Sequence, residues 1–242
     1  MSEVSHPLVK YNLLKYLAGS GWDKVLFQYI HSHEFDEVLQ ELQRLSTAGY
    51  KFCPTVGAMW HWMKVTPYDS IRAMMLIDDS HNQLDSVGIP WVQDMSKMSK
   101  IETARSNAAK YKGRGKDIRI CTRMDIKWFL SELVPDETEY FDYDLTRWCK
   151  QGVLMMPYSP TCRIEGKPHY NLWTDFRARI IEMINDKYKD IPVLLVGERC
   201  HKYEDLIESR YTLPVTVYQE CNHPDWYKIV NEWITGEPIQ WT

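Results

Sequence analysis

The chain has 242 residues, of which 44% are hydrophobic, 26% charged and 13% aromatic. This composition is typical of a folded globular protein, and it excludes extended disorder, collagen and a long coiled coil. No apolar run approaches the roughly 20 residues that a membrane helix requires. Residues 1–11 lack the charged-then-apolar layout of a signal peptide. We therefore expect a soluble protein of the cytoplasm with no membrane partner.

The net charge of −4 arises from 29 basic and 33 acidic residues that are unevenly distributed. Between residues 97 and 123, nine basic residues face two acidic ones, which gives this segment a charge of +7 and leaves −11 for the rest of the chain. Such a segment can neutralise the phosphates of a nucleic acid. It can equally be a solvated surface, or pair with the acidic stretch at 136–144. The candidate DNA-binding residues within it are Lys110, Lys112, Arg114 and Lys116.

Helical and strand patterns alternate along the chain. Apolar residues at helical spacing predict two N-terminal helices, over 8–17 and 35–45, separated by the glycine-containing break at 19–21. The apolar run 73–77 ends abruptly in the polar residues 78–82, as a buried strand does when it leads into a loop. The same pattern recurs at 152–156, 191–196 and 215–218, and helical spacing returns at 173–187 and 226–234.

Short apolar strands joined by helices predict an α/β fold. We expect a single domain over 1–242 with a central four-stranded, mostly parallel sheet flanked by helices. N-terminal helices occupy about 6–46, and a basic insertion or helix occupies about 97–123. Ligands of such sheets bind at the carboxyl ends of the strands, where the four polar loops would gather.

The sequence indicates no cofactor and no metal. Neither GxGxxG nor GxxxxGK[ST] occurs, so a nucleotide cofactor is not predicted. His31 and His33 lack a third metal ligand at sensible spacing. The six cysteines form no CxxC pair, and we expect reduced thiols. Cys221 lies near His223, although neighbouring residues at a strand end commonly point apart, which makes a thiol nucleophile a poor hypothesis.

Several segments in a fixed order resemble the main uracil-DNA glycosylase family. These are LTRWCKQGVLMM at 145–156, WTDF at 173–176, VLLVG at 193–197 followed by HK at 201–202, and the C-terminal stretch 231–241. The resemblance implies the fold of that family. It also implies cofactor-free hydrolysis of the N-glycosidic bond of a base flipped out of DNA.

The family's two catalytic positions have matching residues here. Its GQDPYH motif falls on residues 77–82, where Asp79 matches the aspartate that orients the attacking water and stabilises the positive sugar. A slip of one residue would make Asp78 the equivalent, and both aspartates could instead simply end a strand and cap a helix. The family's HPSPLS loop appears at residues 223–226, where His223 matches the histidine that stabilises the departing base.

The substrate-binding positions depart from the family pattern. Trp91 falls on the aromatic that stacks on the extruded base, although a tryptophan is also an ordinary core residue. Pro157 replaces the base-reading asparagine; Tyr158 or Ser159 could substitute in part, but nothing in the sequence demands it. His81 replaces the tyrosine that crowds the pyrimidine 5-position. The changes at Pro157 and His81 predict a site that accepts a modified pyrimidine. Asp78 is a further candidate substrate-binding residue.

The positions that contact the DNA phosphates in the family are also altered. The family's phosphate-contacting Gly-Ser loop has become Gly197-Glu198, which brings a carboxylate toward a phosphate, and Lys202 is the nearby cation. These losses support an alternative in which a catalytically inactive glycosylase fold serves as a nucleic-acid-binding or protein-interaction subunit. We prefer the enzyme because Asp79, Trp91 and His223 all match. DNA is the expected partner, and a protein partner is also possible. The divergence of the sequence suggests a viral or phage source, in which case the protein would act in the host cytoplasm.

Overall fold

The computed structural model describes residues 6–55, 57–78, 86–94, 120–122, 129–130, 133, 144–164, 168–216 and 221–242. Its N-terminal part is helical. The helices are α1 (His6–Leu17), α2 (Trp22–Val25), α3 (Phe27–Ile30) and α4 (His33–Thr47). Ser32 caps α4 by accepting the backbone N–H of Phe35, and α4 buries Phe35, Val38 and Leu42 at helical spacing. The two predicted N-terminal helices are thus confirmed.

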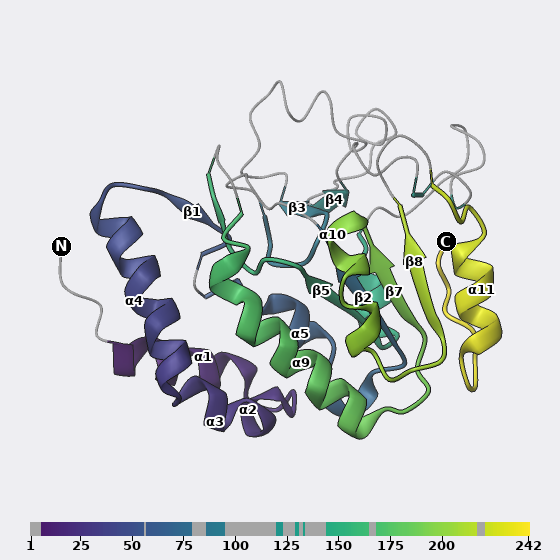
Figure 1. Cartoon of the computed structure of the whole chain (residues 1–242), viewed down its shortest axis with the longest axis horizontal. Coiled ribbons are helices and arrows are strands. Elements are labelled where there is room, and N and C mark those ends of the chain that lie inside the picture. Colours follow the sequence, from purple (N-terminus) through teal and green to yellow (C-terminus); the bar gives the residue numbers. More distant parts are fainter. Residues whose placement is uncertain are drawn as a thin grey trace.

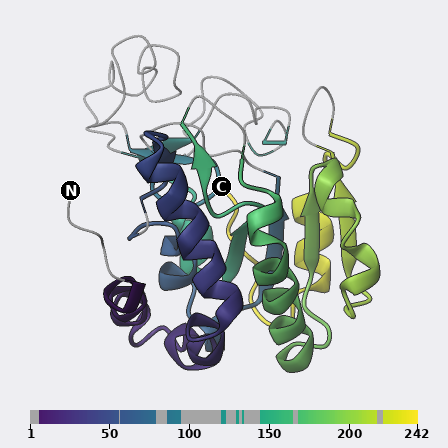
Figure 2. The same ribbon diagram turned by 60° about the vertical axis from the view of Figure 1, so that its left-hand side comes forward.

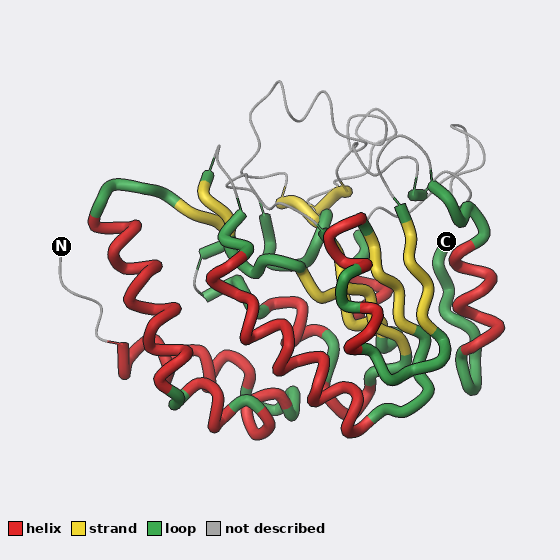
Figure 3. The backbone as a smooth tube through the Cα atoms, viewed as in Figure 1, coloured by secondary structure: helices red, strands yellow, loops and turns green. Residues whose placement is uncertain are grey.

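Four parallel strands form the central sheet. They are β2 (Ala73–Ile77), β5 (Val153–Pro157), β7 (Val193–Val196) and β8 (Thr212–Val215), in the order β5-β2-β7-β8. Every residue of β2, β5 and β7 is buried. Strands buried on both faces read as continuous apolar runs, which is why these three could be predicted. Figure 3 shows these strands in yellow.

The last strand differs from its prediction. We predicted it at 215–218, whereas β8 ends at Val215 and begins three residues earlier, at Thr212. Pro214 lies inside β8, where it has no N–H to donate to a neighbouring strand. β8 is an edge strand, so this missing donor costs no ladder hydrogen bond.

Helices cover both faces of the sheet. In Figure 1, α9 (Thr174–Lys187) and α10 (Glu198–His201) lie in front of the sheet and α5 (His61–Val65) lies behind it, and Figure 2 shows the same layers from the side. α5 and α8 (Thr146–Lys150) contact β5 and each other, while α10 contacts β7 and β8. α11 (Trp226–Trp233) is the last helix, and α9 and α11 confirm the predicted helices at 173–187 and 226–234. The 3₁₀ turns are η1 (Tyr68–Ser70), η4 (Asn171–Trp173) and η5 (Glu204–Leu206).

Two small antiparallel pairs lie outside the central sheet. β1 (Phe52–Cys53) pairs with β6 (Cys162–Arg163), and β3 (Val92–Asp94) pairs with β4 (Ile120–Thr122). Strands this short carry no readable periodicity, so the sequence did not predict them. β4 lies in the basic segment 97–123, and the rest of that segment is outside the described residues.

The C-terminal segment packs back onto α8 and α11. Asn231 accepts hydrogen bonds from the backbone of Ile239 and the indole of Trp241, and the indole of Trp148 donates to the Trp241 carbonyl. Among the described helices, none is long and apolar enough to span a bilayer.

Candidate functional site

The carboxyl ends of the four parallel strands form one edge of the sheet, near the start of α10 at the top of Figure 1. We call it the carboxyl edge. Three backbone hydrogen bonds hold the residues just beyond the strands. The N–H groups of Tyr158, Asp78 and Gly197 donate to the carbonyls of Ile77, Val196 and Val215, at 2.7, 2.9 and 2.7 Å respectively. The predicted site residues Asp78, Tyr158 and Gly197 therefore stand in one row on adjacent strands.

Asp78 is a buried carboxylate with bound partners. It is 5% exposed, its Oδ2 accepts a hydrogen bond from Arg199 Nη1 at 2.9 Å, and its Oδ1 accepts one from the Tyr170 hydroxyl at 3.5 Å. Burial, and then the charge of Asp78, raise the pKa of Tyr170 to about 12, so this hydroxyl remains a donor at neutral pH. The hydrogen bond to Asp78 raises the pKa of Arg199 as well. These bonds hold both oxygens of the Asp78 carboxylate, and the choice between Asp78 and Asp79 as the catalytic aspartate stays a prediction.

Gly197 is required by close packing. Its φ of 98° is a conformation that other residues rarely adopt, and a Cβ added there would lie 2.8 Å from the Cβ of Asp78. The glycine lets the turn from β7 into α10 pass directly over Asp78. A role for Gly197 in DNA binding stays a prediction.

Pro157 and Tyr158 form the β5 part of the carboxyl edge. Pro157 is buried at the end of β5 and offers no side-chain hydrogen-bond donor or acceptor. The ring of Tyr158 lies 5.3 Å from that of Tyr170, measured between centroids. Lys202 is exposed and its Nζ lies 5.4 Å from the Tyr158 ring centroid. The structure therefore brings Lys202, a predicted DNA-binding residue, next to a predicted substrate-binding residue.

Trp91 occupies a strained and enclosed position. Its φ of 66° is unusual for a residue other than glycine and costs on the order of 1–3 kcal/mol. The side chain is 2% exposed and packs on Phe129 at 5.1 Å between ring centroids. Phe129 in turn stacks on Trp226 at 4.4 Å, and the Trp226 indole donates to the Phe129 carbonyl. A base can stack on Trp91 only after neighbouring side chains give way.

His223 is held close to the end of β8 by its neighbour Asn222. The Asn222 side-chain oxygen accepts hydrogen bonds from the backbone N–H and the hydroxyl of Thr216, and Asn222 N–H donates to that hydroxyl. The His223 carbonyl accepts the backbone N–H of Trp226, the first residue of α11. Because β7 lies between β2 and β8, the end of β8 beside the His223 loop is two strand spacings, about 10 Å, from the end of β2 beside Asp78.

Six predicted site residues lie outside the described residues. They are Asp79, His81, Lys110, Lys112, Arg114 and Lys116. Conversely, no sequence motif singles out several residues that the structure brings to the carboxyl edge. These are Tyr170, Arg177, Arg199, Thr216 and Asn222. Tyr170 and Arg199 contact Asp78 from positions distant along the chain, and Arg177, Thr216 and Asn222 contact other loops; periodicity and motif spacing report neither kind of contact.

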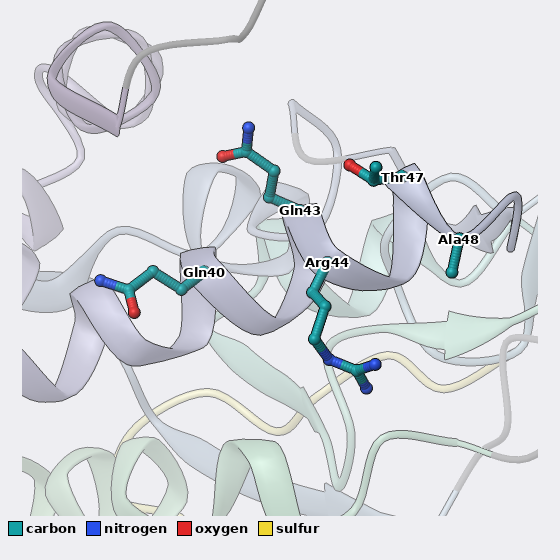
Figure 4. Close-up of a pocket in the computed structure, with 5 residues that line it drawn as sticks. All are labelled: Gln40, Gln43, Arg44, Thr47 and Ala48. Atoms are coloured by element: carbon teal, nitrogen blue, oxygen red, sulfur yellow. The ribbon is translucent and has the colours of Figure 1, made fainter.

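Other polar groups of the described chain form no comparable site. Across the described ranges, no group of three or more His, Cys, Asp or Glu side chains is placed to hold a metal ion. His31 bonds to the Phe27 carbonyl, and His33 lies 3.6 Å from Glu37. Figure 4 shows a surface hollow formed by α4 and the residue after it, and it contains none of the predicted site residues. Its lining residues are Gln40, Gln43, Arg44, Thr47 and Ala48.

Comparison with known proteins identifies related sequences. No family model matches the chain. The chain is 22% identical over 236 residues to the uracil-DNA glycosylase of Streptococcus thermophilus, which covers 92% of this chain and 98% of that protein. It is 26% identical over 192 residues to the uracil-DNA glycosylase of Coxiella burnetii, covering 78% and 74% of the two chains.

Solved structures share the fold. The crystal structure of mimivirus uracil-DNA glycosylase matches with a TM-score of 0.74 at 16% identity, covering 97% of this chain and 91% of that one. The wild-type UNG crystal structure from Nitratifractor salsuginis matches with a TM-score of 0.54 at 17% identity, covering 96% and 94%.

The fully parallel sheet, with helices on both faces and charged and aromatic side chains at its carboxyl edge, defines an α/β protein of the class whose members bind ligands at that edge. Its fold is the uracil-DNA glycosylase fold. The resemblance drawn from the sequence motifs is confirmed, and the chain is a divergent relative of the uracil-DNA glycosylases.

Proposed function

We propose that this protein is a DNA glycosylase that hydrolyses the N-glycosidic bond of a flipped-out pyrimidine carrying a substituent at the 5-position. The observation that carries the proposal is the row of hydrogen-bonded residues at the carboxyl edge. It places Asp78, adjacent to Asp79, between the ends of β5 and β7, with the His223 loop tied to β8. Similarity to uracil-DNA glycosylases over 92% of the chain supports the same class of reaction.

In this reaction the bond between the sugar C1′ and the base nitrogen breaks while a water oxygen bonds to C1′. The carboxylate of Asp79 orients that water and stabilises the positive charge that develops on the sugar. His223 stabilises the negative charge that develops on the base oxygen. The base finally takes up a proton, and the water supplies the hydroxyl of the abasic sugar.

The proposed preference for modified bases follows from two substitutions. An amide side chain can pair with the edge of uracil, and a base lacking the matching groups then leaves buried polar groups unpaired. Pro157 has no such group, so bidentate reading of the uracil edge from this position is lost. His81 is smaller than the tyrosine of the family, which leaves room beside the pyrimidine 5-position.

A panel of oligonucleotides tests the proposal. Each carries uracil, thymine, a 5-hydroxymethylated pyrimidine or a glycosylated pyrimidine, and abasic sites are detected by cleavage in alkali. We expect release of at least one 5-substituted base at a rate equal to or above that of uracil. Efficient release of uracil with rejection of every 5-substituted base would refute the specificity. Binding of DNA without release of any base would favour the inactive, nucleic-acid-binding subunit.

A further inference from the structure

Arg177 lies in the first turns of α9. Its side chain is 1% exposed, and together with Asp78 it accounts for the buried charged residues of the described chain. Taking a guanidinium out of water is costly unless its N–H groups find partners inside the protein. The partners of Arg177 therefore indicate what the protein gains from its burial.

Four hydrogen bonds satisfy the guanidinium, and all of their acceptors are neutral oxygens. Nη1 donates to the carbonyls of Tyr158 at 2.7 Å and Tyr170 at 2.9 Å. Nε donates to the Tyr203 hydroxyl at 2.8 Å, and Nη2 donates to the Thr174 hydroxyl at 3.0 Å. The guanidinium carbon also lies 4.1 Å from the centroid of the Tyr158 ring. Within the described ranges, no carboxylate lies at ion-pair distance from Arg177.

The acceptors come from different segments of the carboxyl edge. Tyr158 follows β5, Tyr170 precedes η4, and Tyr203 follows α10. Because the guanidinium is planar and its N–H directions are fixed, it holds these segments in one mutual arrangement. A lysine, whose ammonium group sits on a flexible stem, could not hold the segments in this way.

The two carbonyls belong to residues that reach the end of β2. Tyr158 N–H donates to the Ile77 carbonyl, and the Tyr170 hydroxyl donates to Asp78. Arg177 is thus joined through two independent routes to the strand end that precedes Asp79. A displacement of either carbonyl would be transmitted directly to that strand end.

We propose that Arg177 is a positioning residue for the reaction. Its guanidinium fixes the loop after β5 and the 168–170 segment against the end of β2, and so holds the catalytic side of the carboxyl edge in its working geometry. The kinetic part of this inference rests on the proposed glycosylase function. Its structural part, the restraint of the loop at Tyr158, does not.

The test compares Arg177→Met and Arg177→Lys with the matched control Arg179→Met. Arg179 lies on the same helix, is exposed, and pairs with Glu182 at 2.7 Å. Base release gives kcat and KM, and hydrogen–deuterium exchange of the peptide 153–160 reports the Tyr158 amide. Arg177→Lys keeps the positive charge but lacks the planar guanidinium with its fixed N–H directions. It is therefore also the variant that tests the inference if Arg177→Met does not fold.

We expect both Arg177 variants to lower kcat by about tenfold or more, with KM changed by less than about threefold, because misplaced groups lose transition-state stabilisation. Exchange of the 153–160 peptide should accelerate, while Arg179→Met leaves both readouts unchanged. Wild-type kcat in Arg177→Lys would overturn the inference, since charge alone would then suffice. If the wild type releases no base, the proposed function fails, and the exchange experiment alone decides: unchanged exchange in both Arg177 variants overturns the positioning role.

Discussion

Substitution of Gly197 by alanine tests whether the carboxyl edge is packed as described. With φ 98° and ψ 148°, Gly197 occupies a region of backbone conformation that is essentially restricted to glycine, and another residue there costs about 1–3 kcal/mol. The new Cβ would also lie 2.8 Å from the Asp78 Cβ, and overpacking of this kind adds about 1–3 kcal/mol. We therefore expect Gly197→Ala to lower the free energy of unfolding by about 2–6 kcal/mol.

The matched control is Gly236→Ala. Gly236 has a similar φ of 89°, but no atom lies within 4 Å of its added Cβ, so only the conformational cost of about 1–3 kcal/mol applies. Urea unfolding of both variants, followed by tryptophan fluorescence, gives the two free energies at a common m-value. Equal destabilisation by the two substitutions would refute the close approach of Gly197 to Asp78.

Three further predictions concern binding, specificity and pH. Replacing the four basic residues between 110 and 116 with alanine should weaken DNA binding. In a filter-binding assay, the slope of log affinity against log salt concentration should become shallower by up to about four units, roughly one per lost phosphate contact. An unchanged slope would show that this stretch is a solvated surface. Restoring family side chains with Pro157→Asn and His81→Tyr should shift the ratio of release rates toward uracil; an unchanged ratio would count against the alignment. Burial lowers the pKa of His61 below its ordinary 6.5, so stability should be complete above about pH 6.5 and fall as the pH drops below it. His61→Gln should reduce this fall between pH 7.5 and 5.5 in urea unfolding, whereas substitution of the exposed His33 should not; parallel declines in wild type and His61→Gln would contradict the assignment.

The fold could be predicted largely because its buried strands stand out in the sequence as continuous apolar runs. β2, β5 and β7 are apolar throughout, and each is followed at once by polar or turn residues. β8 was misplaced because Pro214 interrupts its pattern, and only its edge position makes that proline acceptable. Propensity cannot reveal which strand is at the edge.

The candidate site could be predicted only where a motif marks it. Gly197 and His223 were singled out by the resemblance, and the structure places Gly197 in the row of residues at the carboxyl edge and ties the His223 loop to β8. Arg177 and Arg199 carry no motif: Arg199 contacts Asp78, 121 positions away along the chain, and Arg177 contacts Tyr158 and Tyr203 in two different loops. Such contacts become visible only when the chain is folded.

The most direct test of the account is the rate of base release by Asp79→Asn and His223→Ala, measured in single-turnover reactions on the best substrate of the panel. Groups that stabilise charge in a transition state contribute about a hundredfold or more each. We predict that each variant releases the base at least about a hundredfold more slowly than the wild type while unfolding at a similar urea concentration. Rates equal to that of the wild type in both variants would contradict the assignment of catalysis to the carboxyl edge.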